Sequence, residues 1–218
     1  DYQVWMVIVY HFYGTDGTIE DPVRMIRAVK YGATTGCKLS HKLKKKIRIS
    51  APLLSPVSSS RLTEEFLKII NGGHSFEIVN AALETDLYEY LQPAASNLIL
   101  ENKKFAKSYL ENLKKLDDFV KQNQDSRLGE RLYFLLKDFV EQLTDWKLEI
   151  QSEYSSSEIY KKTWAICRNF VLPINPQRTE LDFAVRKLLQ DAGIQVKPKR
   201  AKRNRKLHIQ QDVSEQEN

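Results

Sequence analysis

The chain has 218 residues, 42% of them hydrophobic and 28% charged, with a formal net charge of +6. This length allows one large domain or two small ones, and the longest apolar run, around Val4 to Val9, is far shorter than the roughly 18–20 residues of a membrane span. The two cysteines, Cys37 and Cys167, lie far apart, which suits a reducing compartment and no disulfide framework, so we predict a cytoplasmic protein without a membrane partner.

The positive charge is concentrated near the C-terminus, and the rest of the chain is close to neutral. A cluster of this density binds polyanions by releasing counterions, without sequence preference, although a solvated tail or a targeting signal is the alternative. Seven cations fall within ten positions: Lys197, Lys199, Arg200, Lys202, Arg203, Arg205 and Lys206.

Periodicity predicts a mainly α protein, in which only residues 3–10 have the β-branched and aromatic composition of a strand. Asp21 is a good N-cap for the first helix, with Pro22 at its first position, and Gly32 or Gly36 would end it. Gly193 would end the order, because residues 197–218 are too polar to bury apolar surface. Helices are expected at about 21–31, 40–49, 58–72, 76–83, 86–91, 102–122, 128–144, 156–170 and 176–192.

Residues 20–30 read Glu-Asp-Pro-Val-Arg-Met-Ile-Arg-Ala-Val-Lys. This segment resembles the neck-helix motif of the class II RNA nucleotidyltransferases, the family of bacterial poly(A) polymerases and CCA-adding enzymes. Residues 51–54 and 60–73 are similar to the second neck helix, and residues 75–93 resemble the following helix of poly(A) polymerases. The resemblance is good over 20–93 and patchy over 94–190, where residues 167–176 resemble a stretch of the enzyme body.

The resemblance implies a division of the chain. In this family an N-terminal head carries a Gly-rich turn and an Asp-x-Asp pair that holds two metal ions, and this chain contains no Asp-x-Asp. We therefore expect Mg²⁺ to be bound in a head that is missing here, not by this chain, and we predict no catalytic or metal-binding residue in it. The expected parts are a remnant of or link to the head (1–19), a neck (20–93), a helical body (94–192) and a basic disordered tail (193–218).

The resemblance also assigns the nucleotide site. Asp21 and Arg24 would bind the Watson–Crick edge of the incoming ATP, with Glu20 and Arg27 in support. A guanidinium offers fixed donors and a carboxylate accepts from an exocyclic amine, which together match adenine. From the local pattern alone, Asp21 could equally be a helix cap and Arg24 its salt-bridge partner three residues on.

A second pair and a second basic cluster are open to two interpretations. Arg61 and Glu65 could form a surface pair four residues apart on one helix, or they could brace the neck beneath the nucleotide. The neck cluster could be a solvated helix face or the wall along which an RNA 3′ end lies. Its predicted RNA-binding residues are Lys42, Lys45, Lys46 and Arg48, to which the cations of the tail are added.

Other chemistry finds no support in the sequence. The four histidines are scattered without metal-ligand spacing, and no P-loop or Gly-x-Gly-x-x-Gly occurs. Aromatic residues of the amphipathic helices are expected to pack in the core and not to stack on bases, namely Tyr133, Phe134, Trp146 and Trp164.

We therefore predict part of a bacterial-type poly(A) polymerase-like enzyme that adds AMP from ATP to RNA 3′ ends. This chain would supply base selection and RNA binding and would be inactive alone. The alternatives are a CCA-adding tRNA nucleotidyltransferase and a non-enzymatic helical RNA-binding module without the head. The sequence gives no indication of the oligomeric state.

Overall fold

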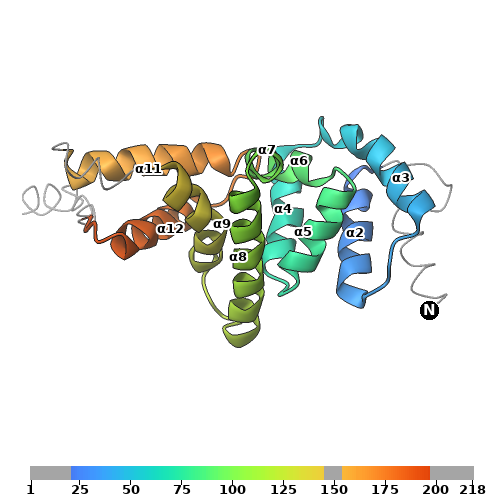
Figure 1. The fold of residues 1–218 in the computed structure, drawn as a ribbon, viewed down its shortest axis with the longest axis horizontal. Coiled ribbons are helices and arrows are strands. Elements are labelled where there is room, and N and C mark those ends of the chain that lie inside the picture. Colours follow the sequence, from blue (N-terminus) through green and yellow to red (C-terminus); the bar gives the residue numbers. More distant parts are fainter. Residues whose placement is uncertain (1–20, 145–153, 197–218) are drawn as a thin grey trace, which may run out of the picture.

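The computed structural model describes residues 21–144 and 154–196, and they form a helical array (Figure 1). No strand occurs in these two ranges, so the mainly α prediction is confirmed. The strand predicted over 3–10 lies outside them. The helices are α2 (Val23–Thr35), α3 (His41–Ser50), the 3₁₀ helix η1 (Ala51–Leu54), α4 (Ser59–Ile70), α5 (Ser75–Glu84), α6 (Tyr88–Leu91), α7 (Pro93–Glu101), α8 (Lys103–Gln122), α9 (Leu128–Leu143), α11 (Ser156–Phe170) and α12 (Arg178–Asp191).

Local signals fix many of the helix ends. The Ser40 hydroxyl accepts a hydrogen bond from the Leu43 amide at 3.2 Å and starts α3, and Ser155 forms a capping box with Glu158 at the start of α11. Helix α2 runs through Gly32 and ends at Gly36, whose φ of 70° lies in the left-handed region that glycine tolerates best. The sequence did not predict η1 or α7.

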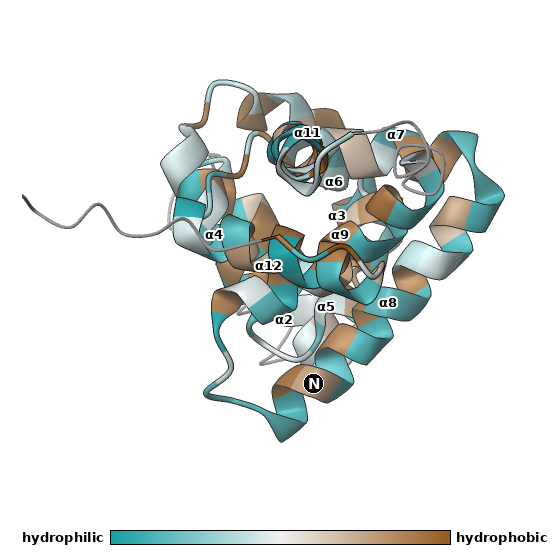
Figure 2. Ribbon diagram, turned by 90° about the vertical axis from the view of Figure 1, so that its left-hand side faces the viewer, coloured by the Kyte–Doolittle hydropathy of each residue, from teal (hydrophilic) through white to brown (hydrophobic). Residues whose placement is uncertain are grey.

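The helices lie along one long axis in Figure 1: α2 to α5 at one end, α8 and α9 in the middle, and α11 and α12 at the other end. A single hydrophobic cluster runs through all of them. Helix α8 illustrates how a helix contributes to this cluster. Apolar residues recur along its whole length (Figure 2), and Phe105, Tyr109, Leu113 and Leu116 are buried in the core. The structure thus gives the predicted neck and body a continuous core.

A carboxylate of α8 caps α5. Asp117, which is 4% exposed, accepts hydrogen bonds from the backbone amides of Ser75 (2.6 Å) and Phe76 (2.9 Å). These amides belong to the first turn of α5 and have no partner within the helix. The local N-cap residue, His74, makes no side-chain cap, so the start of α5 depends on a residue more than 40 positions along the chain.

The C-terminal end of the described chain stays in the core beyond α12. Gly193 follows α12 with a φ of 81°, but Ile194 is 5% exposed and its amide donates to the Leu189 carbonyl at 2.8 Å. The expectation that order ends at Gly193 was therefore wrong, because the apolar Ile194 is buried against the core. The thiols of Cys37 and Cys167 are free, and no described helix is long and apolar enough to cross a membrane.

Candidate functional site

Helix α2 carries the predicted nucleotide-binding residues that the structure describes, whereas Glu20 lies outside the described ranges. Met25, Ile26, Ala28 and Val29 are buried in the core, as the amphipathic pattern requires. Arg24 and Arg27 are only partly buried and belong to the remaining face.

Asp21 caps α2 and also joins it to α4. Its Oδ1 accepts a hydrogen bond from the Val23 amide at 3.2 Å, so the capping prediction is confirmed. Its Oδ2 accepts from Nη2 of Arg61 at 2.7 Å. Two fixed partners therefore hold the carboxylate in one orientation.

Glu65 of α4 is the centre of a second link to α2. Its side chain is 2% exposed and forms ion pairs with Arg27 (2.9 Å), Lys30 (3.2 Å) and Lys68 (3.0 Å). Burial opposes ionisation of this carboxyl, but the hydrogen bond from Lys68, the charge of Lys30 and the hydrogen bond from Arg27 outweigh it, so the pKa of Glu65 lies below its ordinary value.

These two links bear on the two interpretations of Arg61 and Glu65, because the structure shows the two residues bonded to other partners and not to each other. Although the residues stand four apart on α4, each bonds to α2 instead: Arg61 to Asp21, and Glu65 to Arg27. A local pattern could not show this, because the partners are 40 and 38 positions away. The pair joins the two helices, which is the geometry expected of a brace.

Arg24 differs from its neighbours. Its Nη1 atom is buried and has no hydrogen-bond partner in the described part of the chain. A buried guanidinium nitrogen without an acceptor carries the full cost of desolvation, about 1–3 kcal/mol or more for a charged group. Such a group gains most from a ligand that offers an acceptor.

The surroundings of Arg27 differ from those of Asp21 and Arg24. Arg27 bonds to Glu65, and the hollow beside it, about 220 Å³, is lined by Arg27, Lys30, Tyr31 and Thr34 and not by Asp21 or Arg24. Arg27 joins α2 to α4 through Glu65, and nucleotide binding by Asp21, Arg24 and Arg27 stays a prediction.

The basic cluster of α3 is exposed at all four predicted RNA-binding positions, Lys42, Lys45, Lys46 and Arg48. Arg48 has structural partners as well, since its guanidinium pairs with Asp86 at 3.1 Å and donates to the Glu84 carbonyl at the end of α5. The cations of the tail lie outside the described residues, so RNA binding by both clusters stays a prediction.

Metal binding finds no ligand set in the described ranges. No group of three or more His, Cys, Asp or Glu side chains there could hold an ion. The residues that the structure describes therefore do not fit Mg²⁺.

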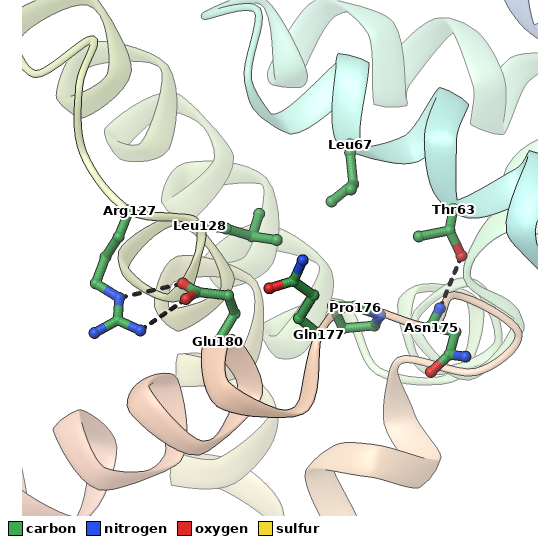
Figure 3. Close-up of a pocket in the computed structure, with 8 residues that line it drawn as sticks. All are labelled: Thr63, Leu67, Arg127, Leu128, Asn175, Pro176, Gln177 and Glu180. Carbon is green, nitrogen blue, oxygen red and sulfur yellow. Dashed lines mark hydrogen bonds and ion pairs between the residues drawn. The ribbon is translucent and has the colours of Figure 1, made fainter.

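A groove that the sequence did not predict separates α4 from the starts of α9 and α12 (Figure 3). It encloses about 390 Å³, with Thr63 and Leu67 of α4 on one side. Arg127 and Glu180 form an ion pair at 2.7 Å at its far end, and the Asn175 amide donates to the Thr63 hydroxyl at 2.8 Å. No sequence pattern indicates this groove, because its lining comes from three segments far apart in the chain.

Part of the chain is similar to known proteins. Residues 36–99 match a family model described as "Probable RNA and SrmB- binding site of polymerase A". Poly(A) polymerase I of Escherichia coli O157:H7 is 36% identical over 83 residues, and that of Haemophilus influenzae is 34% identical over 82 residues; each alignment spans 38% of this chain and 18% of the relative. The CCA-adding enzyme of Bacillus licheniformis is 39% identical over 72 residues, 33% of this chain and 18% of that enzyme.

No solved structure matches the chain. The resemblance to the class II RNA nucleotidyltransferases is confirmed over the matched segment. The stretch aligned with these relatives is only 18% of their own length.

Proposed function

We propose that the chain is the base-selecting and RNA-binding part of a poly(A) polymerase-like nucleotidyltransferase. The complete enzyme would add AMP from ATP to RNA 3′ ends, with Mg²⁺ held by residues outside those described. Similarity to bacterial poly(A) polymerase I and to CCA-adding enzymes supports the reaction class. The matched family description supports RNA as the partner.

The observation that carries base selection is the unpartnered Nη1 of Arg24 close in sequence to a fixed carboxylate. Adenine presents an acceptor at N1 and a donor at N6. Arg24 can donate to the first, and the remaining lone pairs of Asp21 can accept from the second. The ion pair with Arg61 holds Asp21 in place before the nucleotide arrives, so recognition needs no reorganisation of this carboxylate.

Substitution of Arg24 in the complete protein tests this role. Arg24→Ala and Arg24→Lys should each reduce the preference for ATP over CTP by about 10- to 100-fold, the worth of one or two charge-assisted hydrogen bonds. Lysine keeps the charge but loses the planar donors, so it should not rescue the preference. RNA affinity should be unchanged. An unaltered ATP preference in both variants would show that Arg24 does not recognise the base.

A CCA-adding enzyme is the second candidate, favoured by 39% identity to the Bacillus licheniformis enzyme over 72 residues. Such an enzyme would incorporate CTP as well as ATP. Incubating the complete protein with labelled CTP or ATP and an unstructured RNA separates the two, because a poly(A) polymerase extends the RNA with ATP alone.

The chain itself should be tested first with labelled ATP, Mg²⁺ and the same RNA, scoring both retention and extension of the RNA. We expect retention without extension. Extension of the RNA would show that these 218 residues include an active site. If the chain did not retain the RNA, a role unrelated to RNA would be favoured.

A further inference from the structure

A cleft between α11 and α12, beside the start of α9, lies outside the segment that matches the family model. It encloses about 660 Å³, a size that suits a ligand as large as a nucleotide. Three arginines and two aromatic residues dominate its lining: Arg127, Arg178, Arg186, Tyr160 and Phe183.

Each of these arginines lies over an aromatic ring. The guanidinium carbon is 4.1 Å from the ring centre of Phe183 for Arg127, and 4.7 Å from that of Tyr160 for Arg186. The third, Arg178, lies 5.2 Å from the ring of Trp164, which packs against the core as predicted but is only partly buried. Guanidinium planes and aromatic rings are the surfaces on which proteins stack unpaired bases.

Carboxylates hold two of the three arginines in place. Glu180 pairs with Arg127 through two hydrogen bonds of 2.7 and 3.2 Å, and Asp182 accepts from Nε of Arg186 at 2.8 Å and from the Tyr160 hydroxyl. The hydrogen bond from Arg127 keeps the pKa of Glu180 below its ordinary value, so this anchor is ionised at neutral pH. The walls of the cleft are therefore oriented before any ligand binds.

Arg178 is the exception. It is exposed, and although its charge helps to lower the pKa of Asp182, no direct ion pair joins it to a carboxylate in the described ranges. A positive charge in this position can neutralise a phosphate without breaking an existing salt bridge. Arg127 and Arg186 would lose a partner if they turned to do so.

The cleft also adjoins the point where the basic tail begins. Arg186 donates through Nη1 to the carbonyl of Val196 at 3.3 Å, and Val196 is the last described residue. The seven cations of 197–206 follow directly in the sequence. The cleft is therefore the described pocket that lies next to the sequence start of the basic segment.

We propose that this cleft binds single-stranded RNA, with a phosphate on Arg178 and a base stacked against the arginine–aromatic walls. The proposal rests on the proposed RNA-binding function and adds a contact that the 36–99 segment does not contain. Because every base has a stacking face and every nucleotide a phosphate, this contact supplies affinity without sequence preference.

The test compares RNA affinity of the full chain and of variants over a series of salt concentrations. Arg178→Ala should weaken binding and lower the slope of log affinity against log salt by about 0.7, the effect of one lost phosphate contact on a single strand. Phe183→Leu keeps the charge and should weaken binding without changing the slope. Lys115→Ala, an exposed cation of α8 outside the cleft, is the matched control and should retain the parent slope.

Cross-linking gives a readout that does not depend on substitution. RNA containing 4-thiouridine, irradiated with the parent chain, should give adducts on peptides that contain Tyr160, Trp164 or Phe183. Normal slopes for Arg178→Ala together with adducts elsewhere would overturn the cleft assignment and leave the proposed RNA-binding function intact. Failure of the parent chain to bind RNA would overturn both.

An acidic polypeptide is the competing ligand for such a cleft. Poly-glutamate that protects these peptides from cross-linking as well as unlabelled RNA does, at equal charge concentration, would overturn the RNA assignment. We expect unlabelled RNA to be the better competitor, because poly-glutamate has no bases to stack.

Discussion

Two regions bring arginines close to carboxylates but arrange them differently. One is the α2–α4 face, formed by Asp21, Arg24, Arg27, Arg61 and Glu65, and the other is the α11–α12 cleft. On the α2–α4 face, cations converge on Glu65, which is 2% exposed, and Nη1 of Arg24 is itself buried. In the α11–α12 cleft, guanidinium groups lie on aromatic rings, and Arg178 is exposed to solvent. Buried, fixed donors can discriminate between ligands that differ by one hydrogen bond, whereas open, stacked donors give affinity for any strand.

Deleting residues 197–218 should have the largest effect and would sharpen this contrast. If RNA affinity comes mainly from the α12 end, the truncated chain should bind RNA at least about 100-fold more weakly at low salt, since each lost phosphate contact removes about 0.7 from the salt slope. Filter binding between 50 and 300 mM salt measures the slope. A parent-like slope would assign the affinity to the α3 cluster instead.

Removing the Glu65 carboxylate tests whether the α2–α4 face is built on a buried charge. Glu65→Ala leaves Arg27, Lys30 and Lys68 without a common acceptor, and we expect a loss of about 2–3 kcal/mol in the free energy of unfolding. Its neighbour Glu64 is exposed and pairs with Lys68 alone, so Glu64→Ala should cost about 0.5 kcal/mol or less. Urea denaturation of both variants measures the free energies of unfolding. Equal losses in the two variants would show that the buried carboxylate of Glu65 contributes no more than the exposed one of Glu64.

Gly129 offers a corresponding test at the cleft. A Cβ at this position would lie 2.7 Å from Cδ1 of Phe183 and 2.8 Å from the Glu180 carbonyl oxygen, which belongs to the backbone of α12 and cannot rotate away. Gly129→Ala should therefore destabilise the fold by about 1–2 kcal/mol and displace the cleft wall. Chemical denaturation gives the first quantity, and reduced cross-linking at Phe183 would report the second.

The smallest effect concerns pH. The pKa of Glu65 is lowered in the folded chain from its ordinary 4.5, so the unfolded state binds more protons as the pH falls below that value. Its contribution to stability is complete above about pH 4.5 and is lost as the pH falls through the folded pKa. Glu65→Gln should lose stability less steeply than the parent in thermal melts between pH 5 and pH 3. Parallel curves would mean that other carboxyls control the acid transition.

Local patterns predicted the helices well, because their ends are local. Ser40, Asn102 and Ser155 each satisfy amides within three residues of themselves. Helix α7 was not predicted, because its apolar residues do not line a single face: Leu100, for example, is 80% exposed.

The candidate site could be predicted only in part. Asp21 was placed correctly as a cap, but its bond to Arg61 and the bond of Glu65 to Arg27 each cross about 40 residues. Which helix faces which is decided by packing, and an i,i+4 pattern on α4 suggested a pairing that the neighbouring helix overrides. The cleft arginines were missed for the same reason, since α9 and α12 supply the guanidiniums and α11 two of the rings.

The cap that Asp117 places on α5 limits how the molecule can be divided. A fragment that stops at residue 99 would contain the whole family segment, yet the Ser75 and Phe76 amides of α5 would lose their acceptor on α8. The segment defined by similarity therefore lacks the cap of one of its own helices, which α8 supplies from outside it. A fragment that keeps this cap has to reach Asp117, and one that keeps the whole capping helix has to extend through Gln122, where α8 ends.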